Sequence, residues 1–423
     1  YTLYLRGSEK GEKIDRKRVI SLVEACLNPY SDWEAVKEAA RGEDLEYVIS
    51  NTTEAGIVYE PSCKPEDAPP ASFPAKLTRL LYERFMARKK GLVILSCELI
   101  EDNGIELKKC VLRHGKDWGL GKDFAAWLEK ENLFCSTLVD RIVPGRIQDP
   151  AKRRTLEEAN GYEDDLLVVG EVFGVWYIEG PKELEEKLPF QRAGVNVHVV
   201  PQVAPYKKRK VRILNGAHTG MVLGAYLAGF HIVRECMEDE VMLGFMNRML
   251  QREVIPILPL DKQDCEDFAA AVRDRFSNPF VDHQLLSISL NSTSKWRARN
   301  LPSLLEYHEK FGKLPKCLAM SLAFYFAFYS DGLKQREEDA VLAERPDGEE
   351  YRIKDDKAVL DFFWERRDAS PESLLFDGMG REDFWGRDLK EIPGLYPLTL
   401  ENLRRIRRDG AKAAFALAAG DEA

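Results

Sequence analysis

The continuous apolar run at residues 91–96 constrains the fold of this chain more than any other stretch. A short run of this kind predicts a strand that is buried on both faces of a parallel sheet. Residues 45–50 have a similar character, and amphipathic helices are expected around these strands, at residues 32–40, 74–89, 105–118 and 123–132. Strands that alternate with such helices indicate an α/β domain with a mainly parallel sheet.

The chain is expected to divide at residues 201–205, where two prolines interrupt regular structure. Before that point the pattern predicts further strands at residues 1–6, 137–143, 166–177 and 195–200, a helix at 18–26 and a loop at 61–74. After it the pattern predicts helices that include residues 235–254, 260–276, 318–329 and 399–418, with Thr399 as the N-cap of the last, and a charged surface excursion at 331–356. The sequence therefore predicts one domain at residues 1–204 and a mainly helical one at 205–423.

The composition is that of an ordinary globular chain, and it argues against two classes of function. Of the 423 residues 44% are hydrophobic, and the net charge is −9 with basic residues interspersed among acidic ones, so no nucleic-acid surface is expected. No apolar run approaches the roughly 20 residues of a membrane-spanning helix. The eight cysteines are scattered without a Cys-x-x-Cys pair, which predicts no metal site, no structural disulfide and a reducing, cytoplasmic location.

The stretch KKRKVRILNGAHTG contains Lys210, Asn215 and His218, three side chains that can carry acid–base chemistry. On an α-helix they would lie at about 0°, 140° and 80° around the axis, within one sector less than half of the circumference. Leu214 and Ala217 would lie near Lys210, and such an apolar floor disfavours the ammonium form, as a base that works near neutral pH requires. The alternative is a helix with a surface lysine, a cap-like asparagine and a core histidine.

The spacing of Lys210, Asn215 and His218 matches the lysine–asparagine–histidine signature of the polyol-specific long-chain dehydrogenases, the mannitol dehydrogenase family. Further stretches resemble the same family, at residues 50–57, 73–81, 96–100, 134–143 and 213–218. The resemblance begins at Tyr1, continues to Tyr329 and weakens after it. It implies a Rossmann-like N-terminal domain that binds NAD, a mainly α-helical C-terminal substrate domain, and a protein that is often monomeric.

Family members open with a Gly-rich phosphate loop after their first strand, and the first residues of this sequence contain no such loop. We therefore expect the sequence to begin downstream of that strand, inside the dinucleotide-binding domain. The residues that bind the pyrophosphate and that choose between NAD and NADP would then lie outside it. NAD is expected from the resemblance alone.

The resemblance places cofactor-binding residues in the turn after residues 45–50 and directly after the next strand, at Asn51, Thr52, Glu54, Gly56 and Glu98. Polar and small residues at the carboxyl end of a parallel strand are where α/β folds bind ligands. A plain turn between strand and helix is the alternative.

Family members also carry, after the strand that corresponds to residues 91–96, an asparagine that holds the substrate oxygen together with the motif asparagine. Matched by position, this residue is Asn103. The alternative is a structural turn, because Asn-Gly is a common turn-forming pair.

Lys295 corresponds to a family lysine that contacts substrate, and Arg299 would share its face of a helix. His283, which opens a preceding helix, is a third candidate for substrate binding. Clustered cations suit a carboxylate, and arginine can bind one through two parallel hydrogen bonds. A solvated basic patch is the alternative.

Two positions differ from the polyol-selective members of the family. Ser287 stands where those members carry an arginine, and Lys207 and Lys208 stand where they carry acidic residues. On balance the basic cluster suits a sugar acid better than a neutral polyol, in line with a closer resemblance to members that interconvert tagaturonate and altronate.

The resemblance thus implies a zinc-independent NAD-dependent dehydrogenase, and the basic residues favour a small sugar-acid substrate. Lys210 would exchange the proton, Asn215 and Asn103 would polarise the carbonyl oxygen, and His218 would orient the substrate hydroxyls. The alternatives are reduction of fructuronate, oxidation of mannitol or another polyol, and binding of a sugar acid without catalysis.

Overall fold

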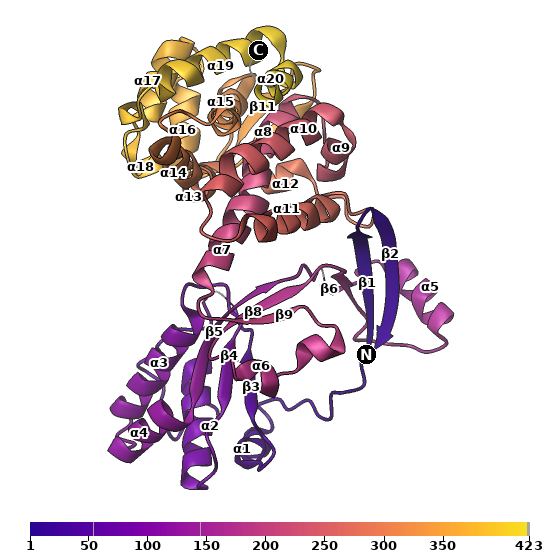
Figure 1. The fold of residues 1–423 in the computed structure, drawn as a ribbon, viewed down its shortest axis with the longest axis vertical. Helices are drawn as coiled ribbons and strands as arrows, with labels where there is room; N and C mark the ends of the chain where they lie inside the picture. The colour runs from indigo at the N-terminus through magenta and orange to yellow at the C-terminus, as the bar shows by residue number, and fades with distance from the viewer. Residues whose placement is uncertain (54, 144, 421–423) are drawn as a thin grey trace. The chain divides into compact units, whose positions relative to one another are not determined.

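The computed structural model describes residues 1–53, 55–143 and 145–420, and its fold is drawn in Figure 1. The chain forms two compact units. One consists of Tyr1–Leu5 with Arg16–Tyr206, and the other of Arg6–Asp15 with Lys207–Ala423.

A five-stranded sheet forms the centre of the first unit, in the order β3-β4-β5-β8-β9. Its strands are β3 (Tyr47–Ser50), β4 (Val93–Ser96), β5 (Leu133–Asp140), β8 (Val175–Glu179) and β9 (Val197–Val200). β3, β4 and β5 run parallel, β8 is antiparallel to β5, and β9 is parallel to β8. Ser50 of β3 pairs with Ser96 of β4, which pairs with Ser136 of β5, so the sheet is in register where β3 and β4 end.

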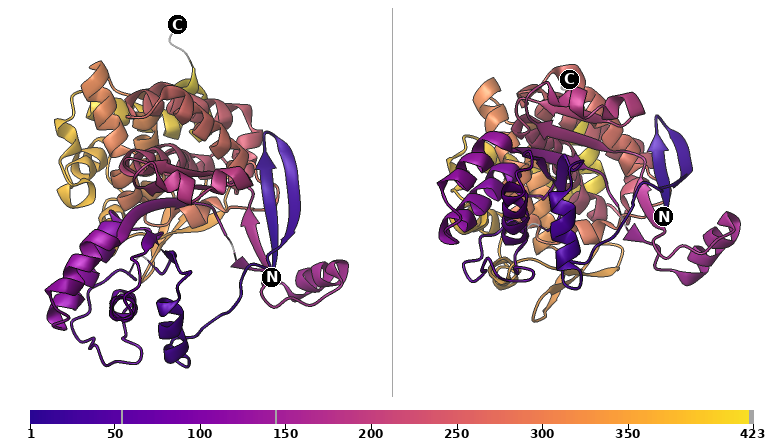
Figure 2. Two further views of the ribbon diagram at one scale, coloured as in Figure 1. Left: turned by 60° about the horizontal axis from the view of Figure 1, so that its bottom comes forward. Right: turned by 90° about the horizontal axis from the view of Figure 1, so that it is seen from below.

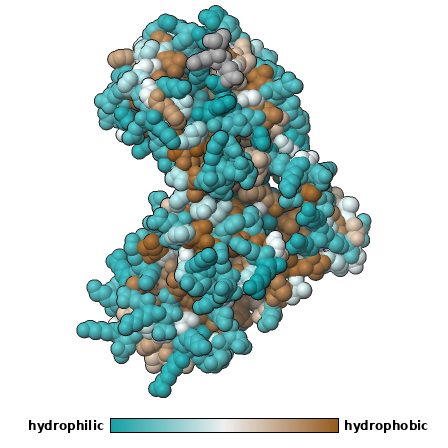
Figure 3. Space-filling model, viewed as in Figure 1, coloured by the Kyte–Doolittle hydropathy of each residue, from teal (hydrophilic) through white to brown (hydrophobic). Residues whose placement is uncertain are grey.

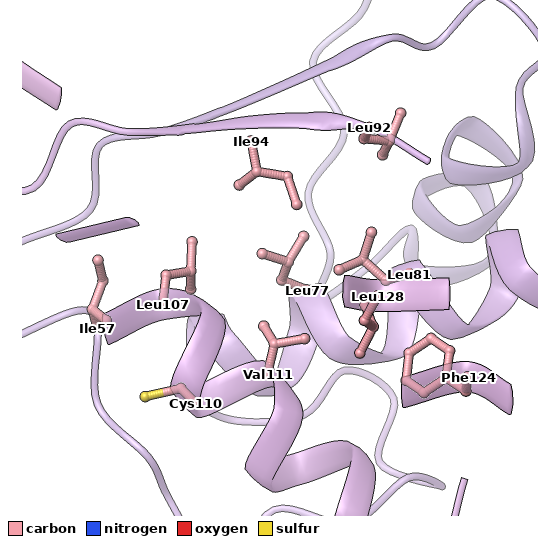
Figure 4. Close-up of a cluster of buried hydrophobic side chains, with 10 residues drawn as sticks. All are labelled: Ile57, Leu77, Leu81, Leu92, Ile94, Leu107, Cys110, Val111, Phe124 and Leu128. Carbon is pink, nitrogen blue, oxygen red and sulfur yellow. The ribbon is translucent and has the colours of Figure 1, made fainter. Parts of the chain in front are cut away.

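Neighbouring residues of β4 enter cores on opposite faces of this sheet, because side chains alternate along a strand. Ile94 packs with side chains from α2 (Phe73–Met86), α3 (Asn103–Asp117) and α4 (Lys122–Glu131) in the cluster of Figure 4. Leu95 packs on the other face with Leu184 of α6 (Leu184–Lys187). Burial on both faces confirms that residues 91–96 contain a buried strand, and the pairings of β3, β4 and β5 confirm a mainly parallel sheet.

Arg84 of α2 ties the ends of three other elements together from an almost fully buried position. Its guanidinium donates hydrogen bonds to the carbonyl oxygens of Ala40 at 3.0 Å, Gly42 at 2.8 Å, Leu45 at 2.8 Å and Lys90 at 2.6 Å. These carbonyls lie at the end of α1 (Trp33–Arg41) and just before β3 and β4. Burial lowers the pKa of Arg84, and the four acceptors compensate for its lost hydration.

We expect Arg84→Met to lower the free energy of unfolding of the first unit by roughly 3 kcal/mol, because four carbonyl oxygens, one of them buried and three partly buried, lose their donor while the apolar stem of the side chain is kept. Urea unfolding followed by circular dichroism measures this change. Arg79→Met is the matched control on the same helix, since Arg79 forms a half-buried ion pair with Glu83, and pairs of that kind contribute roughly 1 kcal/mol or less. An equal loss of unfolding free energy in the two variants would contradict a special structural role for the hydrogen bonds of Arg84.

A second sheet has the strand order β2-β1-β7-β6, and its first two strands form a long two-stranded ribbon (Figure 1, Figure 2). Its strands are β1 (Thr2–Glu9), β2 (Glu12–Val19), β7 (Val168–Glu171) and β6 (Gly145–Arg146), and the exposed α5 (Pro150–Asn160) lies between β6 and β7 in the chain. The predicted helix at 18–26 is wrong, because β2 extends to Val19 and residues 20–32, all of which the structure describes, contain no helix. Lys10 and Gly11 turn the chain with positive φ, so β2 pairs with β1.

Helices dominate the second unit, as predicted. The amino-terminal half contains α8 (Gly216–Leu227), α9 (Val233–Glu238), α10 (Glu240–Arg248), α11 (Lys262–Phe276), α12 (Leu285–Ser289), α13 (Ser292–Arg299), α14 (Leu301–Phe311) and α15 (Lys316–Ser330). The remainder contains α16 (Lys357–Glu365), α17 (Pro371–Met379), α18 (Glu382–Trp385), α19 (Leu395–Asp409) and α20 (Ala411–Ala419). α15 is buried from Cys317 to Ser330 and packs against α8, α19 and α20, so it forms the core.

Three predicted elements of the second unit are wrong in detail. The helix expected at 235–254 is broken at Asp239, whose side chain accepts hydrogen bonds from the first amides of α10. Thr399 is no N-cap, because it lies inside α19 and donates to the Leu395 carbonyl oxygen at 2.8 Å. The expected surface excursion at 331–356 contains an antiparallel sheet of β10 (Leu333–Arg336), β11 (Val341–Glu344) and β12 (Glu350–Ile353).

The visible surface of each unit is mainly hydrophilic, with hydrophobic residues scattered among polar ones (Figure 3). Among the described residues, none of the helices combines the length and the apolar character that crossing a membrane takes. Six of the eight cysteines are buried, Cys97 is half-buried and Cys26 is exposed.

Candidate active site

The carboxyl ends of β3 and β4 are joined by the buried carboxylate of Glu98. It accepts hydrogen bonds from Ser50 Oγ at 3.0 Å, from the Thr52 amide at 3.1 Å and from Thr52 Oγ1 at 3.0 Å. The carboxylate therefore fixes the chain where β3 ends. Glu98 and Thr52, both expected to bind the cofactor, lie in one hydrogen-bonded cluster at this end of the sheet.

In the turn after β3, the backbone at Gly56 lies close to the side chain of Thr52. A Cβ at Gly56 would lie 1.9 Å from Thr52 Oγ1, so only glycine fits there. Asn51 and Thr52 are exposed at the end of the strand. Glu54, the remaining predicted cofactor residue, lies outside the described residues. The turn presents polar groups at the position where parallel sheets bind ligands.

Asn103 is almost fully buried, and both the nitrogen and the oxygen of its side-chain amide are hydrogen-bonded within the protein. Its Nδ2 donates to the carbonyl oxygens of Glu98 at 2.9 Å and Thr137 at 3.0 Å. Its Oδ1 accepts from the amides of Gly104 and Thr137, both at 2.9 Å. Both amide hydrogens are in use, so the expectation that Asn103 polarises the substrate oxygen is not compatible with this geometry. Asn103 instead ties the start of α3 to β5.

In the second unit the residues Val211–Asn215 form a π-helical turn, here called the π-turn, between α7 (Ala204–Lys210) and α8. Hydrogen bonds in a π-helix join residues five apart, so Lys210 and Asn215 lie one turn apart on the same side. His218 follows three residues later on α8 and shares that side. The α-helical angle of about 140° between Lys210 and Asn215 is therefore wrong, and the π-turn aligns the motif better than an α-helix would.

His218 is enclosed by aromatic rings. Its ring stacks on Phe276 of α11, with centroids 4.0 Å apart and planes 10° apart, and it meets the ring of His283 edge-on at 5.3 Å. Burial first, and then positive charge at His283, Arg299, Arg275 and Lys295, lowers the pKa of His218 well below its usual range. The imidazole is therefore neutral near pH 7 and can both donate and accept a hydrogen bond.

The Nε2 atom of His218 is buried and has no hydrogen-bond partner among the described residues. Asn215 is half-buried, and its amide likewise makes no hydrogen bond to another residue in the part of the chain that the structure describes. Buried polar atoms are normally paired, so these two side chains are suited to hydrogen bonds with a bound substrate.

Two cations of α13 lie beside His218. Lys295 Nζ donates to the Ile288 carbonyl oxygen at 2.8 Å, and Arg299 Nη1 donates to Thr219 Oγ1 at 3.2 Å. Burial lowers the pKa of both side chains. Among the described residues, neither has a carboxylate within ion-pair distance. A partly buried cation without a carboxylate is costly, and an anionic ligand would offset that cost.

The second unit thus brings together His218, His283, Lys295 and Arg299 of the predicted substrate residues. Three neighbours were not predicted, namely Thr219, Arg275 and Phe276. Thr219 had a sequence signal, because it lies four residues after Asn215 and would share its face of a helix. Arg275 and Phe276 had none, because they come from a helix far along the chain.

No group of three or more His, Cys, Asp or Glu side chains able to hold a metal ion occurs within residues 1–53, 55–143 and 145–420.

Models of two protein domains match the chain. The mannitol dehydrogenase Rossmann domain matches residues 2–192, and the mannitol dehydrogenase C-terminal domain matches residues 202–360. The altronate oxidoreductase of Pectobacterium atrosepticum is 42% identical over 425 residues, which cover 98% of this chain and 85% of that protein. The altronate oxidoreductase of Bacillus subtilis is 39% identical over 422 residues, which cover 98% and 83%.

This protein belongs to the mannitol dehydrogenase family. The prediction that the chain is a dehydrogenase of this family is confirmed.

Solved structures confirm the predicted fold. A substrate-free D-sorbitol dehydrogenase superposes with a TM-score of 0.79 at 22% identity, over 98% of this chain and 83% of that one. The ternary complex of Pseudomonas fluorescens mannitol 2-dehydrogenase with NAD and D-mannitol has a TM-score of 0.63 at 20% identity, over 98% and 82%. A Rossmann-type domain followed by a helical domain is common to them and to this chain.

Proposed function

We propose that this dehydrogenase interconverts tagaturonate and altronate with NAD, and that Lys210 is its acid–base group. The observation that carries the proposal is the pair of cations Lys295 and Arg299 beside the neutral His218. Such a site suits the carboxylate of a sugar acid better than the end of a neutral polyol. The identity of 42% and 39% to altronate oxidoreductases over 98% of the chain supports the same substrate.

The first unit is suited to NAD at the carboxyl ends of β3 and β4. Glu98 holds the Thr52 amide, Gly56 allows the turn to close, and Asn51 is exposed beside them. Polar groups of this kind at a strand end fit a dinucleotide. When bound, NAD accepts a hydride in oxidation and its reduced form supplies one in reduction.

The proton moves through Lys210. In reduction the Lys210 ammonium gives a proton to the ketone oxygen of tagaturonate as the carbonyl carbon gains a hydride, and in oxidation the neutral amine takes the proton of the hydroxyl group. Asn215, one π-turn further on, donates its amide hydrogen to the same oxygen and stabilises the charge that develops there. The lysine thus takes the role that a zinc ion has in metal-dependent alcohol oxidation.

The other residues hold the substrate. The neutral His218 accepts or donates a hydrogen bond at a neighbouring hydroxyl through Nε2. Arg299 and Lys295 bind the carboxylate, the arginine through its planar fork. Among the described residues, neither cation has a carboxylate within ion-pair distance.

The proposal is tested by NADH oxidation with tagaturonate, fructuronate and fructose side by side. We expect kcat/KM for tagaturonate to exceed each of the others by at least about tenfold, a difference of about 1.4 kcal/mol in transition-state binding. Preference for fructuronate would move the substrate to another hexuronate. Equal or faster turnover of fructose would contradict a sugar-acid substrate.

A further inference from the structure

The π-turn needs support, because π-helical segments are rare and usually occur as single turns held by their surroundings. It is also what aligns Lys210 with Asn215. Whatever fixes the register of this turn therefore controls the geometry of the proposed acid–base site.

Glu306 of α14 contacts the chain on both sides of Lys210. Its Oε1 accepts from Arg212 Nη2 at 3.1 Å, and its Oε2 lies 2.9 Å from Lys208 Nζ. Lys208 and Arg212 are four residues apart and, on a helix, share one face, whereas Lys210 lies about 200° away from Lys208. The carboxylate thus contacts one face of the helix, and helical spacing places Lys210 on the opposite face.

Arg212 is the central member of this contact, since it lies within the π-turn itself. It is almost fully buried, and it also donates to Ser303 Oγ at 2.8 Å. Burial lowers the pKa of Arg212 and the charge of Glu306 raises it, so the carboxylate compensates a cation that has few other partners. Loss of Glu306 would leave the buried Arg212 guanidinium without its charge partner.

A second anchor lies on a different helix. Arg209 donates to Asp264 of α11 at 2.5 Å, and its guanidinium lies 4.4 Å from the centroid of the Phe268 ring. The segment that precedes the π-turn is therefore fixed to both α11 and α14. This gives a structural role to Lys208, Arg209 and Arg212, three basic residues near Lys210 that the proposed chemistry does not use.

We propose that Glu306, with Arg212 and Lys208, forms a clamp that sets the register of the π-turn, and that Glu306 and Arg212 are positioning residues for Lys210 and Asn215. This inference rests on the proposed function, because it assigns the clamp to the acid–base groups of that reaction. It predicts that weakening the clamp misplaces the amine without weakening the binding of substrate or NADH.

The test compares Glu306→Gln and Arg212→Lys with Glu309→Gln, an exposed glutamate on the same helix. We expect kcat to fall by about tenfold to a hundredfold in the first two, because a misplacement of about 1 Å can have that effect. KM for the substrate and the Kd for NADH are expected to stay within about twofold, and Glu309→Gln to match the wild type. Lys208→Gln should cause a smaller loss, because it leaves the Arg212–Glu306 contact intact.

Unchanged kcat in both Glu306→Gln and Arg212→Lys would overturn the clamp, and so would a loss of kcat accompanied by an equal rise in KM and in the Kd for NADH. Each variant is assayed with whichever of tagaturonate, fructuronate or fructose the wild type reduces fastest. A wrong substrate assignment would then appear in the wild type alone. A failure of the clamp would appear only in the variants.

Discussion

Lys210→Ala is expected to lower kcat by at least about a thousandfold while NADH still binds with wild-type affinity. General acid–base catalysis contributes up to about ten-thousandfold, and alanine leaves no group at this position that can exchange a proton. Stopped-flow or steady-state NADH oxidation measures kcat, and quenching of protein fluorescence by NADH measures the Kd.

Lys207→Ala is the matched control, because it removes a half-buried lysine from the same helix three residues earlier. Its kcat should stay within about twofold of the wild type. Wild-type turnover in Lys210→Ala would remove this lysine from the acid–base role. An equal loss in both variants would point to damage to α7 rather than to lost chemistry.

Arg299→Met is expected to raise KM for tagaturonate by about 30- to 100-fold and to leave turnover of fructose nearly unchanged. A hydrogen bond between a guanidinium and a carboxylate contributes about 1.5–3 kcal/mol, and every 1.4 kcal/mol is about a tenfold change in affinity. Fructose has no carboxylate, so it loses nothing at this position. Steady-state kinetics with both substrates separate the two effects.

Arg297→Met is the control for this change, since Arg297 lies on the same helix with an exposed side chain. Arg299→Lys should give an intermediate KM, because an ammonium keeps the charge but not the planar fork. If KM for fructose rose as much as KM for tagaturonate, Arg299 would act on the shape of the site and not on a carboxylate.

The fold was predictable from the sequence wherever the apolar or alternating pattern of a segment matches the burial of its side chains in the structure. The apolar run at 91–96 is a buried parallel strand because both of its faces are covered, and the strongly apolar stretch at 318–329 lies within the core helix α15. The strands β11 and β12 also had a signal, since β12 alternates exposed and buried residues after the Asp347-Gly348 turn. β2 had no comparable signal, because its strand depends on pairing with β1.

The kinds of residue in the site were predictable, but their geometry was not. The same residues between Lys210 and Asn215 can form an α-helix or a π-turn, and the choice depends on Glu306, which is far along the chain. Asn103 illustrates the same limit, because only the structure reveals that its amide hydrogens are both bound to backbone carbonyls. Sequence spacing specifies which groups can meet, whereas the partners of each group are set by distant parts of the fold.

The π-turn also limits how this enzyme can be altered by evolution or by engineering. Removing or inserting one residue between Lys210 and Asn215 would rotate the amine by about 100° relative to everything that follows. The length of this segment is therefore fixed even where its side chains can vary, and variants with new substrate preferences should arise from substitutions on α13 rather than from insertions or deletions here.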